Sequence, residues 1–330
     1  MRWVAMPDSR THDLPPRWAL SVLACPACKS PVQLGGAEFR CATHGAVGRW
    51  DAGIARFDVS DSDAQIAWYR SKGGANFQER IRIPFTMTGL DMPVYHSHLA
   101  RIAPADKAGV IVDVGSGDGR NTTPWLDRGY QRVIAVDPIP AALERLRAAL
   151  DASGVDSGER LLLVQSDARA LPLATGAGAC VFAIEALCYL NEDYSVGMRE
   201  CARIVAPGAR LLVSERSWEG GLLSSLLYDG VPAMVEAARS SYLLEGAGAN
   251  CVRSRVFNRD ELLAEIAKAG LIVDAEMGIS LLSVAMGFLR GKGAIAESDA
   301  SYGAEVEALL QQLGELGQAR RAHVVVAQKS

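Results

Sequence analysis

The sequence lacks both a membrane-length apolar run and a strong excess of either charge. Its 330 residues contain 34 lysines and arginines against 38 aspartates and glutamates, a formal net charge of −4. The nearest approach to a membrane span, Gly278–Leu289, falls short of the ~18 to 20 apolar residues that a spanning helix needs. We therefore expect no membrane span. A wholly basic nucleic-acid-binding surface is disfavoured, although a local basic patch stays open.

Cysteine is scarce as well, with seven residues, an odd number for this length. We therefore expect no disulfide scaffold. The first residues include Arg2, Asp8, Arg10 and Asp13 with no apolar stretch among them, so we expect no signal peptide. The chain length predicts about two domains. Together these properties predict a cytoplasmic enzyme or binding protein.

Three of the cysteines and one histidine lie in two short pairs. Two residues separate Cys25 from Cys28, two separate Cys41 from His44, and twelve lie between the pairs. Pairs at this spacing can place four ligands around one tetrahedral Zn²⁺. Four protein ligands leave no open coordination position, so we predict a structural zinc site. The alternative is three reduced core cysteines and an unrelated surface histidine.

The stretch between the two pairs predicts a β-hairpin over Pro31–Arg40, with Gly35 and Gly36 at its turn. A module of about 40 residues cannot hold a hydrophobic core alone, so a metal would supply folding energy. We therefore predict a zinc-ribbon module over residues 1–59.

Residues 60–106 are expected to form a helical linker or lid. Helical patches lie at Ala64–Arg70, Gln78–Ile83 and Val94–Ile102, separated by Pro84 and Pro93. The last patch carries His96 and His98. Whether this segment covers a ligand or only packs between two domains stays open at this point.

From Gly109 onwards, short apolar runs alternate with helical patterns. Continuous apolar runs are typical of strands that are covered on both faces. We predict strands at Val110–Val112, Val133–Val136, Leu161–Val164, Cys180–Ile184, Leu211–Val213, Leu271–Val273 and His323–Ala327. The helices expected between them include Ala141–Leu150 and Arg259–Ala269, the second beginning with a capping box. This alternation predicts an α/β fold with a doubly wound, mainly parallel sheet.

A glycine-rich loop follows the first of these strands. It reads Asp113-Val114-Gly115-Ser116-Gly117-Asp118-Gly119, and a second strand ends in Asp137, twenty residues after Gly117. Glycines at a strand–helix junction let the backbone approach a ligand, and a carboxylate at the next strand end can bind ribose hydroxyls. The spacing departs from the NAD-binding pattern, and no Gly-Lys-Ser/Thr sequence follows, which excludes a Walker loop.

With these motifs the sequence resembles the class I S-adenosylmethionine-dependent methyltransferases over about residues 105–330. Further matches are Ser166-Asp167-Ala168 after the third strand and Ala206-Pro207-Gly208-Ala209 before the fifth. The resemblance implies a Rossmann-like sheet of seven strands and a methyltransferase domain over residues 107–330. It also implies that S-adenosylmethionine is bound by Asp113, Gly115, Ser116, Gly117, Asp137, Pro138, Asp167, Ala168 and Glu185.

In this family the end of the fourth strand faces the reactive methyl group. Glu185 ends that strand and is the best acid–base or orienting residue, although another cofactor contact is an equal alternative. Tyr189, His96 and His98 are further candidates for a catalytic role. Neither an Asn/Asp-Pro-Pro-Tyr sequence nor a Pro-Cys nucleophile is present at this strand. Insertions over residues 218–256 and 278–321 would shape the acceptor pocket or form a homodimer interface.

The N-terminal module resembles small zinc-ribbon proteins that activate tRNA and protein methyltransferases. Those usually have cysteine where this chain has His44, which is a departure from their ligand set. A similar module precedes the large-subunit rRNA guanine-N1 methyltransferases, which makes an rRNA or tRNA base methyltransferase the main alternative. Residues 1–60 hold seven basic against five acidic residues, whereas an RNA binder is expected to show a strong basic stripe. We therefore favour a small-molecule acceptor, such as one of specialised metabolism; a cofactor-binding protein without methyl transfer is a further alternative.

Overall fold

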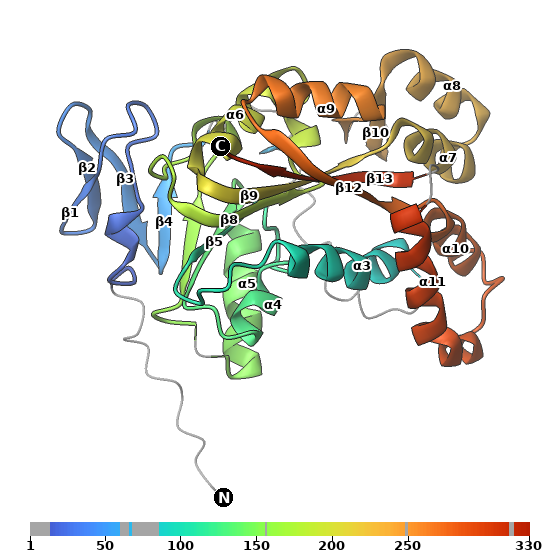
Figure 1. Cartoon of the computed structure of the whole chain (residues 1–330), viewed down its shortest axis with the longest axis horizontal. Helices are drawn as coiled ribbons and strands as arrows, with labels where there is room; N and C mark the ends of the chain where they lie inside the picture. The colour runs from blue at the N-terminus through green and yellow to red at the C-terminus, as the bar shows by residue number, and fades with distance from the viewer. Residues whose placement is uncertain (1–13, 60–65, 68–85, 156, 248–249, 317–319) are drawn as a thin grey trace, which may run out of the picture.

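One eleven-stranded sheet runs through the molecule, with helices against both of its faces (Figure 1). The computed structural model describes residues 14–59, 66–67, 86–155, 157–247, 250–316 and 320–330. Within these residues, no helix is both long and apolar enough to cross a bilayer.

Seven strands form the centre of the sheet, in the order β7-β6-β5-β8-β9-β13-β12. All neighbours pair in parallel except β13, which is antiparallel to both β9 and β12. The bounds are β5 (Val110–Val114), β6 (Arg132–Asp137), β7 (Leu161–Gln165), β8 (Gly178–Ile184), β9 (Val205–Arg216), β12 (Ile272–Ser280) and β13 (Arg320–Gln328). The predicted α/β fold with seven mainly parallel strands is confirmed.

Helices divide between the two faces of this central sheet. One face packs against α6 (Tyr194–Ile204) and α9 (Arg259–Lys268). The other packs against α3 (Met87–Arg101), α4 (Thr123–Asp127), α5 (Pro140–Ser153) and α11 (Gly303–Leu316). All five residues of β5 are buried, as its continuous apolar run predicts. The capping box of α9 is present, with the Asn258 side chain accepting from the backbone of Glu261 at 2.9 Å.

Four short strands of the N-terminal region extend the same sheet. They are β1 (Gln33–Gly35), β2 (Glu38–Cys41), β3 (Gly45–Asp51) and β4 (Ile54–Phe57), after a short 3₁₀ helix, η1 (Ala19–Ser21). β1 and β2 form the predicted hairpin. β4 then pairs in parallel with β7, from Ile54 opposite Leu163 to Arg56 opposite Gln165. The N-terminal strands are therefore continuous with the central sheet.

The segment between these strands and β5 contains α3. The predicted helix at Gln78–Ile83 lies outside the described residues, as does Ala64–Arg70 apart from Ile66 and Ala67, which are helical. The expectation that Pro93 separates two helical patches was wrong, because α3 runs through it. A proline inside a helix removes one backbone hydrogen bond; here the helix is held by its N-cap, where the Thr86 side chain accepts from Gly89 at 3.1 Å, and by a largely buried face.

Both predicted insertions contain helices. Residues 218–256 form α7 (Trp218–Asp229), α8 (Val231–Ser240) and the hairpin of β10 (Tyr242–Ala247) and β11 (Asn250–Arg255). Residues 278–321 carry α10 (Leu282–Gly291), η4 (Glu297–Tyr302) and α11 between β12 and β13. The remaining short helices are η2 (Ala168–Ala170) and η3 (Leu187–Asp193). Figure 1 shows α7, α8, α10 and α11 grouped at one end of the molecule.

Candidate functional site

The loop after β5 has a backbone that only glycine adopts easily. Gly115 and Gly117 have φ values of +78° and +53°, in the left-handed region that disfavours other residues. A Cβ atom on Gly115 would lie 2.3 Å from the Cβ of Ala186, whereas a Cβ on Gly117 would meet nothing within 4 Å. Gly115 therefore allows close packing against the end of β8, and Gly117 leaves room for a ligand against the backbone.

Asp137 faces this loop from the end of β6. Its carboxylate accepts from the backbone N–H of Gly117 and of Ile139, each at 2.8 Å. The residue is only 6% exposed, and burial raises the pKa of its carboxyl group to about 6. The predicted ribose-binding acid is thus fixed against the glycine loop, with Pro138 following it half-buried.

Asp113 lies deeper, in the strand itself. It accepts a hydrogen bond from the Thr122 hydroxyl at 2.6 Å, and burial raises the pKa of its carboxyl group to about 7. Nearby in the chain, the Ser116 hydroxyl and the Asn121 side-chain oxygen are buried and have no hydrogen-bond partner within the described residues. Such orphaned groups commonly bind water or a ligand. The open space at Gly117 and these two groups fit a nucleoside cofactor at this loop.

The end of β7 brings Asp167 and Ala168 to the same edge of the sheet. Asp167 caps η2 by accepting from the backbone of Arg169 at 2.8 Å. The Arg169 guanidinium also pairs with Asp167 at 2.7 Å and with Asp193 at 3.1 Å. Sequence reasoning missed Arg169, although its position two residues after a predicted cofactor-binding acid was a usable signal.

Glu185, at the end of β8, lies in a buried network of charges. Its carboxylate pairs with Arg321 and, at 3.2 Å, with Arg216, and accepts from the Tyr95 hydroxyl at 2.7 Å. Arg321 also pairs with Asp91 at 2.8 Å. Burial alone would raise the pKa of the Glu185 carboxyl, but the adjacent Arg321 and Arg216 guanidinium groups hold it below its ordinary value.

Three members of this network were not predicted from the sequence. They are Asp91 and Tyr95 on α3 and Arg321 at the start of β13, all buried. Glu185 and Arg321 are 136 residues apart, so only the strand order brings them together. Arg216, by contrast, is the last residue of β9, and so lies on the same edge of the sheet as Glu185.

The remaining predicted catalytic residues lie in different surroundings. His96 is half-buried, and its Nε2 donates to the carbonyl of Arg120, in the stretch after the glycine loop, at 3.1 Å. Burial lowers the pKa of its imidazole, so His96 is uncharged at pH 7. Tyr189 is half-buried, and its hydroxyl accepts from Arg216 at 3.1 Å. His98 is fully buried and bonds to the Gly278 carbonyl of β12 at 3.3 Å, which favours a packing role.

The four predicted metal ligands converge at the N-terminal strands. The ligand atoms of Cys25, Cys28, Cys41 and His44 all lie within 4.8 Å of one another. The Sγ atoms of Cys28 and Cys41 are 3.6 Å apart, and His44 Nδ1 lies 3.5 Å from Cys25 Sγ and 3.7 Å from Cys41 Sγ. A tetrahedral site with Zn–S bonds of about 2.3 Å requires ligand separations of about 3.5 to 3.8 Å. The geometry therefore fits Zn²⁺.

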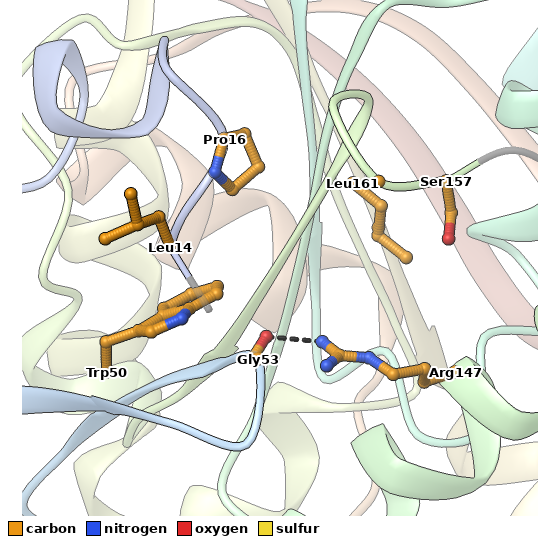
Figure 2. Close-up of a pocket in the computed structure, with 8 residues that line it drawn as sticks. Leu14, Pro16, Trp50, Gly53, Arg147, Ser157 and Leu161 are labelled. Atoms are coloured by element: carbon orange, nitrogen blue, oxygen red, sulfur yellow. Dashed lines mark hydrogen bonds between the residues drawn. The ribbon is translucent and has the colours of Figure 1, made fainter. Parts of the chain in front are cut away.

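A small cavity lies where β4 and β7 begin, at the edge of the sheet opposite to Asp137 and Glu185 (Figure 2). Its volume is about 10 Å³, room for one water at most. Figure 2 shows Arg147 reaching across it to the carbonyl of Gly53, and Arg147 also donates to Ala52 at 2.9 Å. The cavity is a packing gap between α5 and the N-terminal strands, too small for a methyl acceptor.

Known methyltransferases match the part of the chain that contains these candidate site residues. The family model "Methyltransferase domain" matches residues 112–213, which include the glycine loop, Asp137, Asp167 and Glu185. Uncharacterised methyltransferases of Mycobacterium tuberculosis and Mycobacterium bovis are each 34% identical over 101 residues, 31% of this chain and 37% of theirs. The matched region thus spans little more than a third of the length of these relatives.

Two solved structures share the fold over a larger part of the chain. One comes from a complex between the Haloferax volcanii Trm112 methyltransferase activator and a methyltransferase, with a TM-score of 0.51 and 18% identity over 81% of this chain and 96% of that one. The other is the CcbJ methyltransferase of Streptomyces caelestis, with a TM-score of 0.50 and 19% identity over 73% and 96%. At these identities the likeness shows the fold alone. Residues 112–213 are thus similar in sequence to the methyltransferase domain family, and the chain shares the fold of known methyltransferases.

Proposed function

We propose that the whole chain transfers a methyl group from S-adenosylmethionine to a small-molecule acceptor at the carboxyl edge of its central sheet. The observation that carries this proposal is the pairing of Asp137 with the backbone of Gly117 at 2.8 Å, beside open space at that glycine. This arrangement suits a ligand that carries a ribose.

Each strand end contributes one part of the cofactor site in this proposal. Gly115, Ser116 and Gly117 bring backbone against the cofactor, Asp113 lies beneath them, and Asp137, followed by Pro138, binds the ribose hydroxyls. Asp167 accepts from the adenine amine and the backbone N–H of Ala168 donates to the ring. Because Asp167 is paired with Arg169, the adenine amine shares that carboxylate with the guanidinium group.

When bound, S-adenosylmethionine supplies a sulfonium methyl group, whose bond to sulfur breaks with its electron pair going to sulfur while an acceptor lone pair forms the new bond. The chain contributes mainly alignment to such an in-line displacement. His96 is uncharged, as a proton acceptor must be, and its Nε2 is committed to Arg120, which leaves Nδ1 for a proton. Tyr189 would line the acceptor side. His98 would act only by packing.

The charge of the chain supports a small acceptor over RNA. The net charge of −4 gives the chain no overall attraction for a polyanion. The ion pairs of the N-terminal strands reduce their positive field further, since Arg40 pairs with Glu38 and Arg56 with Asp51.

We propose a structural role for zinc at Cys25, Cys28, Cys41 and His44. The four ligands complete a tetrahedral shell, so no position remains for a substrate. Cys25 and Cys41 are buried and belong to the same hydrophobic core as the central sheet. The metal would therefore stabilise the strands that extend the sheet.

Release of S-adenosylhomocysteine tests this function. The zinc-loaded chain is incubated with S-adenosylmethionine and, separately, with a panel of small metabolites and with total RNA. We expect release with a small molecule, and a fall of about tenfold or more in the Asp137→Asn variant because a charge-assisted hydrogen bond is lost. Asp151→Asn, an exposed carboxylate on α5, is the control. Release only with RNA would contradict the proposed acceptor. Cofactor binding without release on any acceptor would favour a protein that binds the cofactor without methyl transfer.

A further inference from the structure

We propose that Arg321 is a positioning residue of the methyl-transfer site, which holds Glu185 as a fully hydrogen-bonded carboxylate that orients Tyr95 and Arg216. This inference rests on the proposed function for its site, but it assigns Glu185 a different task from that of a proton acceptor.

Glu185 has no lone pair left for a substrate. One oxygen, Oε1, accepts from Tyr95 at 2.7 Å and from Nη2 of Arg321; the other, Oε2, accepts from Nη1 of Arg321 at 3.1 Å and from Arg216 at 3.2 Å. A carboxylate offers about four lone-pair positions. All are used by the protein, and two of the four bonds form the planar fork that arginine makes with a carboxylate.

Arg321 is itself held on two sides. Its Nε pairs with Asp91 of α3 at 2.8 Å, and Asp91 is only 3% exposed. Its backbone carbonyl accepts from Ser217 at 2.9 Å. Gly220 in the first turn of α7 packs directly on that carbonyl, because a Cβ there would lie 2.5 Å from the oxygen. Asp91 of α3 thus holds the guanidinium while Ser217 and α7 hold the backbone, and together they set the position of any carboxylate that binds Arg321.

The backbone of Glu185 shows that its position is enforced. Its φ is +48°, a conformation that is unfavourable for a residue with a side chain and persists only where the surroundings fix it. The Glu185 N–H donates to the carbonyl of Ser214 in β9 at 2.7 Å. Strained residues of this kind gather at functional sites, and Glu185 lies at the strand end that carries the site.

The groups that Glu185 contacts belong to a wider hydrogen-bond network at the ends of β8 and β9. Tyr95 contacts both Glu185 and the Ser214 hydroxyl, the latter at 2.9 Å. Arg216 extends from Glu185 to the hydroxyl of Ser254 at 3.1 Å and to Tyr189 at 3.1 Å. A proton released by the acceptor therefore goes to another base or to solvent. Glu185 fixes the hydroxyl and guanidinium groups around the methyl position.

Carbon-13 NMR of protein labelled at the glutamate carboxyl carbon tests this assignment without an acceptor. The Glu185 signal is identified by its absence in Glu185→Gln. In the wild type we expect it to titrate well below the ordinary glutamate range, since Arg321, Arg216 and Tyr95 face it, while the nearby carboxyl groups of Asp91 and Glu215 have raised pKa values and are protonated in that range. In Arg321→Gln we expect the midpoint to rise by about one pH unit or more, and Arg321→Lys should restore part of the shift.

Arg203→Gln is the matched control, because Arg203 makes a similar fork with Glu200 on α6, at 2.7 and 2.9 Å, and should leave the Glu185 signal unchanged. If Arg321→Gln does not fold, the wild-type titration still decides, and Tyr95→Phe removes one donor of the four. An ordinary midpoint in the wild type would overturn the proposal. So would a loss of S-adenosylmethionine affinity of tenfold or more in Glu185→Gln, because Glu185 would then contact the cofactor. A wild type that binds no S-adenosylmethionine would refute the proposed function while leaving the titration intact.

Discussion

At the scale of single residues, the meeting of the glycine loop with Asp137 could be predicted, and the partners of Glu185 could not. Gly115, Gly117 and Asp137 follow a local rule, because a strand–loop–helix turn needs glycine at fixed positions and a carboxylate at the next strand end. Glu185 was found by the same rule, but its partner Arg321 was not. A buried ion pair between residues 136 positions apart has no local signal, and it reverses the chemistry expected of the carboxylate.

Glu215 is a second residue whose chemistry depends on its surroundings in the fold, here through the protonation state of its carboxyl group. Its side chain is fully buried beside Cys188 and Tyr194, and neither oxygen makes a hydrogen bond of normal geometry within the described residues. Burial, with a smaller effect of the nearby Glu185 charge, raises the pKa of its carboxyl to about 8. The carboxyl is therefore protonated in the folded chain at neutral pH.

This protonation predicts a pH-dependent stability. Between the ordinary glutamate pKa and about 8, the folded state holds a proton that the unfolded state releases, so stability falls as the pH rises, by at most about 1.4 kcal/mol per pH unit. Glu215→Gln removes this loss, and urea unfolding at pH 6 and pH 8 should show the variant gaining on the wild type at the higher pH. Glu305→Gln, on the exposed side of α11, is the control. An equal difference at both pH values would contradict the buried, protonated carboxyl.

At the scale of elements, the sequence predicted the individual strands and helices well. It predicted less well how the strands pair with one another in the sheet. The seven central strands, the β1–β2 hairpin and the capped α9 follow from apolar runs, glycines and capping residues. The parallel pairing of β4 with β7 does not, because strand order depends on contacts across the whole chain. Nor does Pro93 separate two helical patches as expected, since α3 continues through it where tertiary packing outweighs the local preference.

The β4–β7 pairing predicts that zinc stabilises more than its own module. Cys28→Ser should lower the zinc content of the purified chain and reduce hydrogen-exchange protection in β7, because β4 donates and accepts along that strand. Protection in β12, at the far end of the sheet order, is the internal control and should fall less. Zinc content equal to that of the wild type would contradict the ligand assignment, and unchanged protection in β7 would contradict the coupling.

At the scale of the whole molecule, one sheet carries two separate sites. Its N-terminal strands hold the metal-ligand cluster, and its central strands end in the glycine loop, Asp137, Asp167 and Glu185. The residues of both parts share one hydrophobic core on the face of α6 and α9, which includes Phe39 and Phe57 of the N-terminal strands together with Val112 of β5. The two parts that length suggests therefore share one continuous sheet.

The most direct test of the cofactor site is calorimetric titration of the wild type, Gly117→Ala and Gly129→Ala with S-adenosylmethionine. Both glycines have positive φ values, +53° and +85°, and a Cβ at either meets nothing within 4 Å, so the two variants carry similar backbone strain. Only the Cβ at position 117 would enter the space assigned to the cofactor. We predict binding by the wild type, a loss of about tenfold or more in Gly117→Ala, equivalent to about 1.4 kcal/mol, and near-wild-type affinity in Gly129→Ala. No binding by the wild type, or equal affinity in all three proteins, would contradict the site.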